Sequence, residues 1–203
     1  MGRRNLWSRR ASLQAIAVVV ASLALPRPAL ALTDAEAADL IRQLIAELYA
    51  VTDASRPDAL VFREVEEILG RYSELPVIAR SSLGAAWRVA TDDQKARYIK
   101  VFAGYLSRKY GRRFRDFAIA EVVVSNTRKV TSGYMVSSTV HMKDGPRYGI
   151  EWQVVNIGGK EKLVNLTIEG LSMLASERNG IASMLDERRG DIDKLIDDLA
   201  SKG

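Results

Sequence analysis

Residues 148–154 read YGIEWQV, and this stretch decides the fold class. Its aromatic and aliphatic side chains stand at every second position, separated by Gly149, Glu151 and Gln153. In an extended strand successive side chains point to opposite faces, so this strand would have one apolar face and one polar face. Such a strand is typical of an antiparallel sheet that is covered on a single side.

Three further segments show the same alternation. Glycine and proline in residues 143–146 and 158–159 suit tight turns between consecutive strands. The sequence therefore predicts a four-stranded antiparallel sheet with one covered face. The apolar positions of the other three segments are Ala120, Val122 and Val124, then Val136, Val140 and Met142, and then Val164, Leu166 and Ile168.

Helical periodicity occupies the chain on both sides of these segments. Thr33 and Thr91 each begin a capping-box pattern ahead of an apolar stripe, and we expect the second of these helices to end near Gly111. Apolar stripes in residues 171–185 and 192–199 predict two more helices. We therefore predict an α+β fold in which helices pack on one face of a curved four-stranded antiparallel sheet. Such a fold either packs solid or encloses a cavity, and the pattern is compatible with both.

The composition excludes several kinds of chemistry. The 203 residues include no cysteine, so disulfide frameworks, thiolate metal sites and cysteine nucleophiles are ruled out. The single histidine, His141, leaves no partner for an all-histidine metal site and falls in the polar phase of its strand. We assign no catalytic residue and no metal ligand.

Residues 1–31 are typical of an export signal. Arginines without any acid precede residue 11, an apolar run follows from Ala15 to Leu25, and residues 29–31 have the Ala-x-Ala pattern of a cleavage site. The apolar run is too short to span a bilayer. Residues 8–13 resemble the twin-arginine export pattern, and the general secretory route fits the same basic start. We expect residues 32–203 to form a single mature domain in the periplasm.

The net charge depends on this first segment. The whole chain carries 30 basic and 25 acidic residues, for a formal net charge of +5. Five of the basic residues and none of the acids precede residue 32, so the remaining chain is neutral overall. A domain that binds nucleic acid needs a net or clustered positive surface. We therefore expect no nucleic-acid partner.

Three blocks of the chain resemble a known family. Residues 77–91 read VIARSSLGAAWRVAT, and apolar or aromatic side chains follow at every fourth position of residues 98–110. The second block comprises residues 145–152, 168–173 and Arg178, and the third comprises residues 190–196. In this order and at this spacing they resemble the MlaC / toluene-tolerance (Ttg2-type) family of periplasmic phospholipid-binding proteins. The resemblance spans nearly all of the chain after residue 31.

This resemblance implies a carrier without catalytic activity or cofactor. Family members take phospholipid between an inner-membrane MCE-type ABC transporter and an outer-membrane lipoprotein complex. The lipid tails would lie in an apolar pocket between the sheet and its helices, with a volume in the upper part of the range of about 300–1,000 Å³ or larger. We expect the carrier to be monomeric.

The resemblance also supplies candidate site residues. Arg80 and Arg178 occupy basic positions of the family pattern and would meet the phosphate of a headgroup. The structural alternative makes these arginines solvated surface groups and makes the candidate wall residues part of a dry core. The candidates for the pocket wall are Trp87, Phe102, Leu106, Tyr110, Val140, Ile150, Trp152 and Ile168.

Other interpretations stay open at this point. The cargo could be a polycyclic lipid such as a hopanoid, or the chain could be an adaptor with a solid core. A helix-covered curved sheet also occurs in small isomerases and dehydratases, which use a carboxylate base and a tyrosine in an apolar pocket. Residues 108–115 form the densest basic run, which would either dock on an anionic surface or complement the end of a helix.

Overall fold

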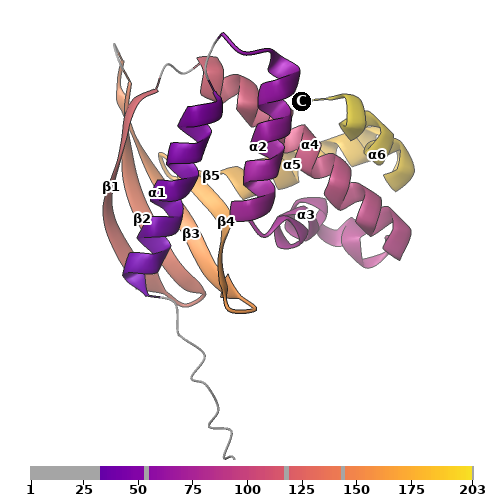
Figure 1. Cartoon of the computed structure of the whole chain (residues 1–203). Coiled ribbons are helices and arrows are strands. Elements are labelled where there is room, and N and C mark those ends of the chain that lie inside the picture. The colour runs from indigo at the N-terminus through magenta and orange to yellow at the C-terminus, as the bar shows by residue number, and fades with distance from the viewer. Residues whose placement is uncertain (1–32, 53–54, 117–118, 143–144, 203) are drawn as a thin grey trace, which may run out of the picture.

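The computed structural model describes residues 33–52, 55–116, 119–142 and 145–202. The expected export signal, residues 1–31, lies outside these described residues and stays a prediction. No helix within the described ranges is long and apolar enough to cross a bilayer. Figure 1 shows a sheet with helices over one of its faces and a group of helices beside it.

Helices come first along the chain. They are α1 (Asp34–Val51), α2 (Asp58–Tyr72), α3 (Leu75–Leu83), the 3-10 helix η1 (Gly84–Arg88) and α4 (Asp92–Asp116). Five strands follow: β1 (Ile119–Val130), β2 (Gly133–Met142), β3 (Arg147–Ile157), β4 (Lys160–Ile168) and the two-residue β5 (Leu171–Ser172). Two helices, α5 (Met173–Glu187) and α6 (Ile192–Ser201), close the described chain.

The strands pair with their sequence neighbours in the order β1-β2-β3-β4-β5, all antiparallel. This confirms the predicted α+β class and the four long strands, and adds the short β5. In the register, Trp152 lies opposite Val136 on one side and Leu166 on the other. Because residues directly opposite each other share a face, the alternating apolar positions of the sequence meet on one surface of the sheet.

A bulge in β4 changes the expected register. Gln153 pairs with Asn165 but Val154 pairs with Leu163, so Val164 is the extra residue on its strand. The shift by one residue turns Leu163 to the covered face, where it is buried together with Val164. The sequence pattern indicated Val164 and did not indicate Leu163, because strict alternation contains no signal for an inserted residue.

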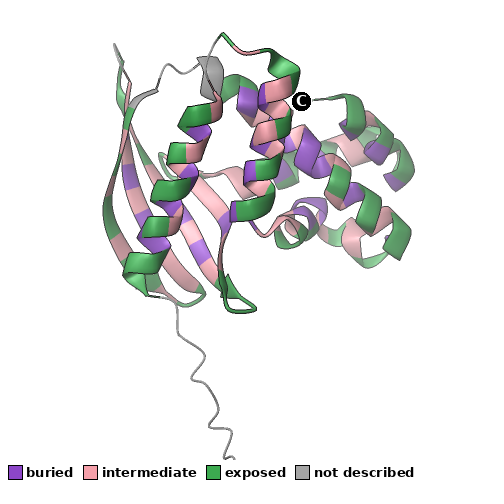
Figure 2. Ribbon diagram, in the orientation of Figure 1, coloured by how far each residue is buried: buried purple, intermediate pink, exposed green. Residues whose placement is uncertain are grey.

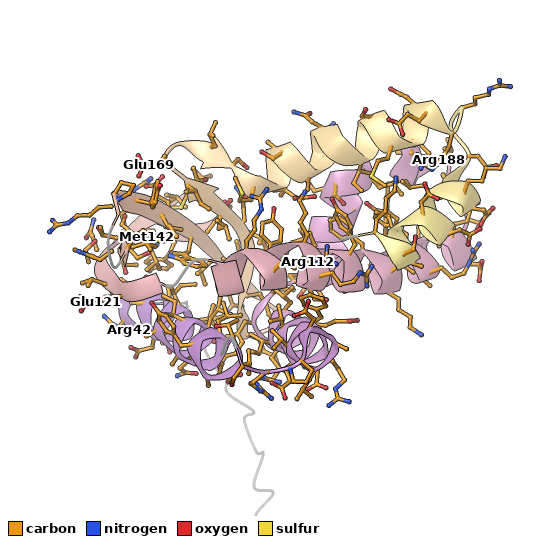
Figure 3. The ribbon with its side chains drawn as sticks, turned by 90° about the horizontal axis from the view of Figure 1, so that it is seen from above. Arg42, Arg112, Glu121, Met142, Glu169 and Arg188 are labelled. Carbon is orange, nitrogen blue, oxygen red and sulfur yellow. The ribbon has the colours of Figure 1, made fainter. Side chains whose placement is uncertain are left out.

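The helices form two groups, one over the covered face of the sheet and one beside it. Helix α1 lies across the covered face against β1, β2 and β4, and α2 packs beside α1 and on α4 (Figure 1). Helix α5 packs on β4 and α3, and α6 packs on α4. In the view from above, α4 lies between α2 and α5 (Figure 3). Both α1 and α2 carry exposed residues on the side away from the sheet (Figure 2).

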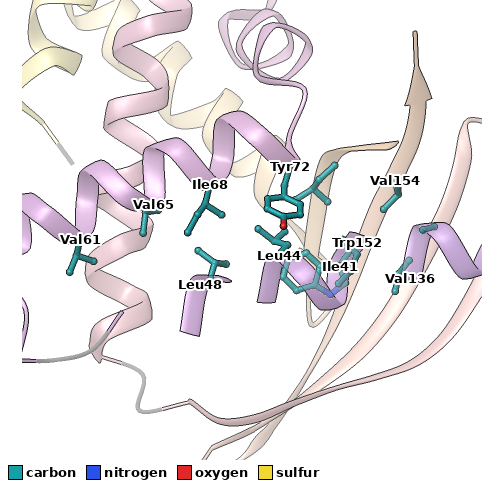
Figure 4. Packing of buried hydrophobic residues seen from close by; sticks show 12 residues of the cluster. Ile41, Leu44, Leu48, Val61, Val65, Ile68, Tyr72, Val136, Trp152 and Val154 are labelled. Carbon is teal, nitrogen blue, oxygen red and sulfur yellow. The ribbon is translucent and has the colours of Figure 1, made fainter. Parts of the chain in front are cut away.

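Buried side chains divide into two clusters, which we call the sheet core and the helical core. The sheet core joins α1 and α2 to the covered face and is drawn in Figure 4: Ala37, Ile41, Leu44, Leu48, Val61, Val65, Ile68, Tyr72, Val136, Trp152, Val154 and Leu163. The helical core contains no strand residue: Ala79, Leu83, Ala90, Tyr98, Phe102, Leu106, Ile181, Ile192, Leu195, Ile196 and Leu199. Leu69 of α2 packs against both.

The two predicted capping boxes are confirmed and one predicted helix end is wrong. Thr33 and Thr91 each accept a hydrogen bond from the backbone N–H three residues on, as capping boxes require. Helix α4 continues past Gly111 to Asp116. Gly111 is needed there for a different reason, because a Cβ at this position would lie 2.9 Å from the ring of Phe62.

Candidate functional site

An apolar cavity of about 100 Å³ lies where the sheet core and the helical core meet. Its wall combines residues from α1 and α2, from α3 and α4, from β3 and β4, and from the first two turns of α5. The lining residues are Leu44, Leu48, Val65, Leu69, Ser73, Ile78, Leu106, Tyr110, Trp152, Leu163, Val164, Asn165, Leu166, Met173, Leu174 and Glu177.

The cavity is smaller than the expected pocket of about 300–1,000 Å³. It is also smaller than an engineered cavity of about 150 Å³ that admits benzene. The side chains of the wall themselves occupy the space between the sheet and its helices, with Leu44, Leu106 and Trp152 buried there. A hydrocarbon tail therefore enters only if the helices that line the cavity move away from the sheet.

The structure brings three of the eight candidate wall residues together around this cavity. They are Leu106 and Tyr110, from successive turns of α4, and Trp152 from β3. The buried indole N–H of Trp152 donates to the Ser138 hydroxyl at 2.8 Å, which lets this large side chain lie within an apolar face.

The other five candidates lie outside the cavity lining. Phe102 is buried in the helical core, where its ring stacks on those of Tyr98 and Tyr105. Trp87 lies on a different surface, described below. The remaining three belong to the sheet: Val140 is buried, Ile150 packs against the sheet core, and Ile168 pairs with Ile150.

Two parts of the wall were not among the predicted residues. One is the stripe of α1 and α2 that includes Leu44, Leu48 and Val65, which was visible as an ordinary helix stripe. The other is the start of α5, where Leu174 and Glu177 face the cavity. Nothing in a single sequence separates a stripe that lines a cavity from one that fills a core.

Glu177 is a buried carboxylate in this otherwise apolar wall. It is 4% exposed, and its Oε1 accepts hydrogen bonds from the Lys109 ammonium at 2.7 Å and from the Tyr110 hydroxyl at 2.6 Å. Its Oε2 is buried and has no hydrogen-bond partner among the described residues. An unpaired buried acceptor costs about 1–3 kcal/mol, and more when it is charged.

The charge of Glu177 changes the acidity of its partners. Burial raises the pKa of the Tyr110 hydroxyl, and the hydrogen bond to Glu177 raises it further, so Tyr110 stays a donor at any physiological pH. Burial by itself lowers the pKa of Lys109, but the hydrogen bonds to Glu177 and Tyr105 outweigh it and the pKa is raised. Lys109 is therefore a cation that faces the carboxylate.

Arg80 and Arg178, the two candidate headgroup residues, meet in a separate groove of about 500 Å³ together with Arg88. None of the three arginines has a hydrogen bond or ion pair within the described part of the chain. Gly84 makes room for one of them, because a Cβ on it would lie 3.3 Å from the Arg178 Nε. We call this surface the arginine groove; its other lining residues are Val77, Ser81, Gly84, Ala85 and Trp87.

The arginine groove and the cavity lie on different faces of the same two helices. Ile78 of α3 and Glu177 of α5 line the cavity, whereas their neighbours Val77 and Arg178 line the groove. The two sites have no lining residue in common. The groove is therefore separated from the cavity by the packed pair α3 and α5.

The basic run at the end of α4 is used mainly within the fold. The Arg108 guanidinium donates to the carbonyl groups of Leu199 and Lys202 at the end of α6. Lys109 pairs with Glu177, and the Arg112 guanidinium lies 5.6 Å from the centre of the Phe62 ring. Arg108 therefore complements the end of α6, while docking of the run on an anionic surface stays a prediction.

No group of three or more His, Asp or Glu side chains that could hold a metal ion occurs among the described residues. Tyr98, which is fully buried in the helical core, shares a hydrogen bond with the Ser82 hydroxyl at 2.8 Å. Burial raises the pKa of Tyr98, which keeps it neutral.

This arrangement of a half-covered antiparallel sheet and helices also occurs in a protein of known structure. A phospholipid-binding protein from Ralstonia solanacearum, solved in complex with a phospholipid, matches with a TM-score of 0.68 and 19% sequence identity. The match covers 81% of this chain and 99% of that chain. At 19% identity, this structural similarity establishes a shared fold and nothing beyond it.

A family model described as MlaC protein matches residues 38–201. The chain belongs to this family. It is also 27% identical over 153 residues to the toluene tolerance protein ttg2D of Pseudomonas putida, an alignment that covers 73% of this chain and 69% of that protein.

Proposed function

We propose that this protein is a periplasmic carrier that binds the acyl chains of a phospholipid in the cavity between the two cores. The observation that carries the proposal is a wall of aliphatic side chains, drawn from helices and strands, that is interrupted only by a few polar groups. Membership of the MlaC family supports it, as does the phospholipid bound to the Ralstonia solanacearum protein of the same fold.

Such a carrier must offset a large free-energy cost of moving an acyl chain out of a membrane. Moving an acyl chain of about 15 methylenes from a membrane into water costs on the order of 12 kcal/mol of free energy, at roughly 0.8 kcal/mol for each methylene. An apolar wall restores most of this, while the phosphate must stay near water or cationic partners. A chemical step is not needed, and we propose none.

Loading requires the cavity to widen. Without a tail, the leucines of the wall pack on one another and on Trp152, which keeps their apolar surface away from water. A tail replaces these contacts with equivalent ones, so the narrow and the widened forms differ little in exposed apolar area. The carrier can therefore release a lipid without exposing an empty apolar pocket.

The remaining candidate roles are part of the same proposal. Residues 1–31 direct export, and residues 32–203 act as a single, monomeric lipid-binding domain. Arg80 and Arg178, joined by Arg88, bind the phosphate of a headgroup in the arginine groove, and α3 and α5 separate on loading so that one lipid reaches both the groove and the cavity. The carrier passes phospholipid between an inner-membrane MCE-type ABC transporter and an outer-membrane lipoprotein complex.

Mass spectrometry of the lipids extracted from the purified native protein tests the proposal. We expect phospholipid in near-stoichiometric amount, and a strong reduction in Leu106→Trp, which fills the cavity. Leu185→Trp is the matched control, because Leu185 packs against the helical core outside the cavity. A protein that binds no lipid, natively or after exposure to vesicles, would overturn the carrier. If only polycyclic lipids were extracted, the protein would still be a lipid carrier, but its cargo would be a polycyclic lipid and not a phospholipid.

A further inference from the structure

The unpartnered oxygen of Glu177 is the feature of the cavity that lipid carriage leaves unexplained. The Glu177 side chain is 5% exposed, and one of its two carboxylate oxygens takes both available donors, Lys109 and Tyr110. The other oxygen, Oε2, is buried without a partner in the part of the chain that the structure describes. A carboxylate has about four acceptor positions, so this oxygen can take a donor that the protein does not supply.

Resting on the proposed function, we propose that the cavity binds a lipid whose buried hydrocarbon carries a hydroxyl group, and that this hydroxyl donates to Glu177 Oε2. Buried polar groups in native proteins are almost always paired, and an exception inside a binding cavity points to a group of the ligand. The cargo would then be distinguished by its tail as well as by its headgroup.

The surroundings of Glu177 select a neutral donor. The Lys109 ammonium already balances the carboxylate at 2.7 Å and also lies 5.8 Å from the centre of the Tyr110 ring. A second ammonium on the other carboxylate oxygen would be repelled by Lys109. The cavity lining that the structure describes contains no second carboxylate that would balance such a cation. A hydroxyl supplies the missing hydrogen bond without adding charge.

The position of Glu177 places the hydroxyl in the tail region. Glu177 lies among Leu106, Met173 and Leu174, on the cavity side of α5. The arginine groove, with its three cations, is on the other side of that helix. A hydroxyl of the headgroup would belong with the phosphate, whereas a hydroxyl on an acyl chain or on a fused-ring skeleton can reach Glu177.

Competition binding tests the inference. Single-chain phospholipids with an unsubstituted acyl chain, or with one hydroxyl at successive positions, would displace a fluorescent phospholipid from the wild-type protein. A polycyclic alcohol and its parent hydrocarbon form a second matched pair that distinguishes the two sources of the hydroxyl. We expect at least one hydroxylated ligand to bind about 5- to 100-fold more tightly than its unsubstituted partner.

The variant Glu177→Met removes the acceptor and keeps a side chain of similar length. It should lose the preference for the hydroxyl, so that the two members of each matched pair bind equally. Glu187→Met, on an exposed position of the same helix, should keep the preference. The wild-type comparison needs no variant, so a folding defect in Glu177→Met would leave the inference testable.

Each outcome separates the two proposals. Equal binding of every matched pair by the wild type overturns the hydroxyl inference and leaves the carrier intact, with water as the partner of Glu177. A preference that survives in Glu177→Met also overturns it. Failure of all chains to bind, hydroxylated or not, overturns the carrier itself.

Discussion

Gly111 lies within α4, where a glycine would ordinarily weaken a helix. The position has no room for a side chain, because the ring of Phe62 on α2 occupies the place of its Cβ. Gly180, within α5, has no atom near the corresponding place. Two glycines that both lie within helices therefore differ in the space available for a side chain.

The two glycines give a matched pair of substitutions. Gly111→Ala forces α2 and α4 apart and should lower the free energy of unfolding by about 1–3 kcal/mol. Gly180→Ala should raise it by about 0.5–1 kcal/mol, because alanine is the better helix former. Urea denaturation measures both, and a stabilised Gly111→Ala would contradict the close approach of the two helices.

Ser138 gives a second test at the scale of single residues. Ser138→Ala removes the partner of the buried Trp152 indole N–H, and an unpaired buried donor costs about 1–3 kcal/mol. The exposed Ser125, whose hydroxyl donates to the Ser137 carbonyl, provides the control Ser125→Ala. Chemical denaturation should show the larger loss for Ser138→Ala, and equal losses would mean that water replaces the serine.

At the scale of elements, α1 and α2 are joined by a carboxylate. Glu47 of α1 accepts a hydrogen bond from the Tyr72 hydroxyl at 2.6 Å and pairs with Arg71, both at the end of α2. The hydrogen bond from Tyr72, and then that from Arg71, lowers the pKa of Glu47 from its ordinary value of 4.5. The ionised form is therefore favoured in the folded protein.

The sign of this shift predicts an acid-sensitive link. A carboxyl with a lowered pKa stabilises the fold above its ordinary pKa, and the contribution is lost as the pH falls through the folded value. The unfolding free energy should therefore decrease below about pH 4.5, and Glu47→Gln should make this decrease shallower. Asp186→Asn, at an exposed position of α5, is the control. An unchanged pH profile for Glu47→Gln would show that the link contributes nothing.

The elements also show how far a single sequence leads. Period-two alternation predicted the four long strands, because each alternates between a covered and an open face. Val164 and Leu163 show what alternation misses, since an inserted residue changes the side to which a side chain points. Leu171 was expected in a helix and instead belongs to β5, where it pairs with Ile168 of β4. Ser172 caps the helix that begins at Met173.

The candidate site was predicted less completely than the fold. Leu106, Tyr110 and Trp152 line the cavity, but Phe102 has the same spacing as Leu106 and lies outside the cavity lining. The spacing fixes the face of α4 and not which partner covers each turn of it. The pairing of Glu177 with residues of α4 depends on a contact between distant segments, which periodicity cannot express.

At the scale of the whole molecule, the cavity joins two clusters that are otherwise built separately. Lipid binding should therefore change the amide hydrogen exchange of α1 and of the start of α5, which contribute to the wall. Helix α6 contributes no residue to the wall and packs on α4, so its exchange should stay constant. Mass-spectrometric exchange with and without phospholipid measures this. A uniform change over all helices would instead indicate general stabilisation.

The order of the elements along the chain has a consequence for biosynthesis. Ala37 and Ile41 of α1 are among the first described residues to emerge from the ribosome, yet they belong to the same buried cluster as Val154 and Leu163 of β3 and β4. Contacts between such distant segments form late and slowly. Until translation reaches the strands, the apolar side of the first helix lacks most of the native surface that covers it, and the nascent polypeptide is open to aggregation or to capture by chaperones.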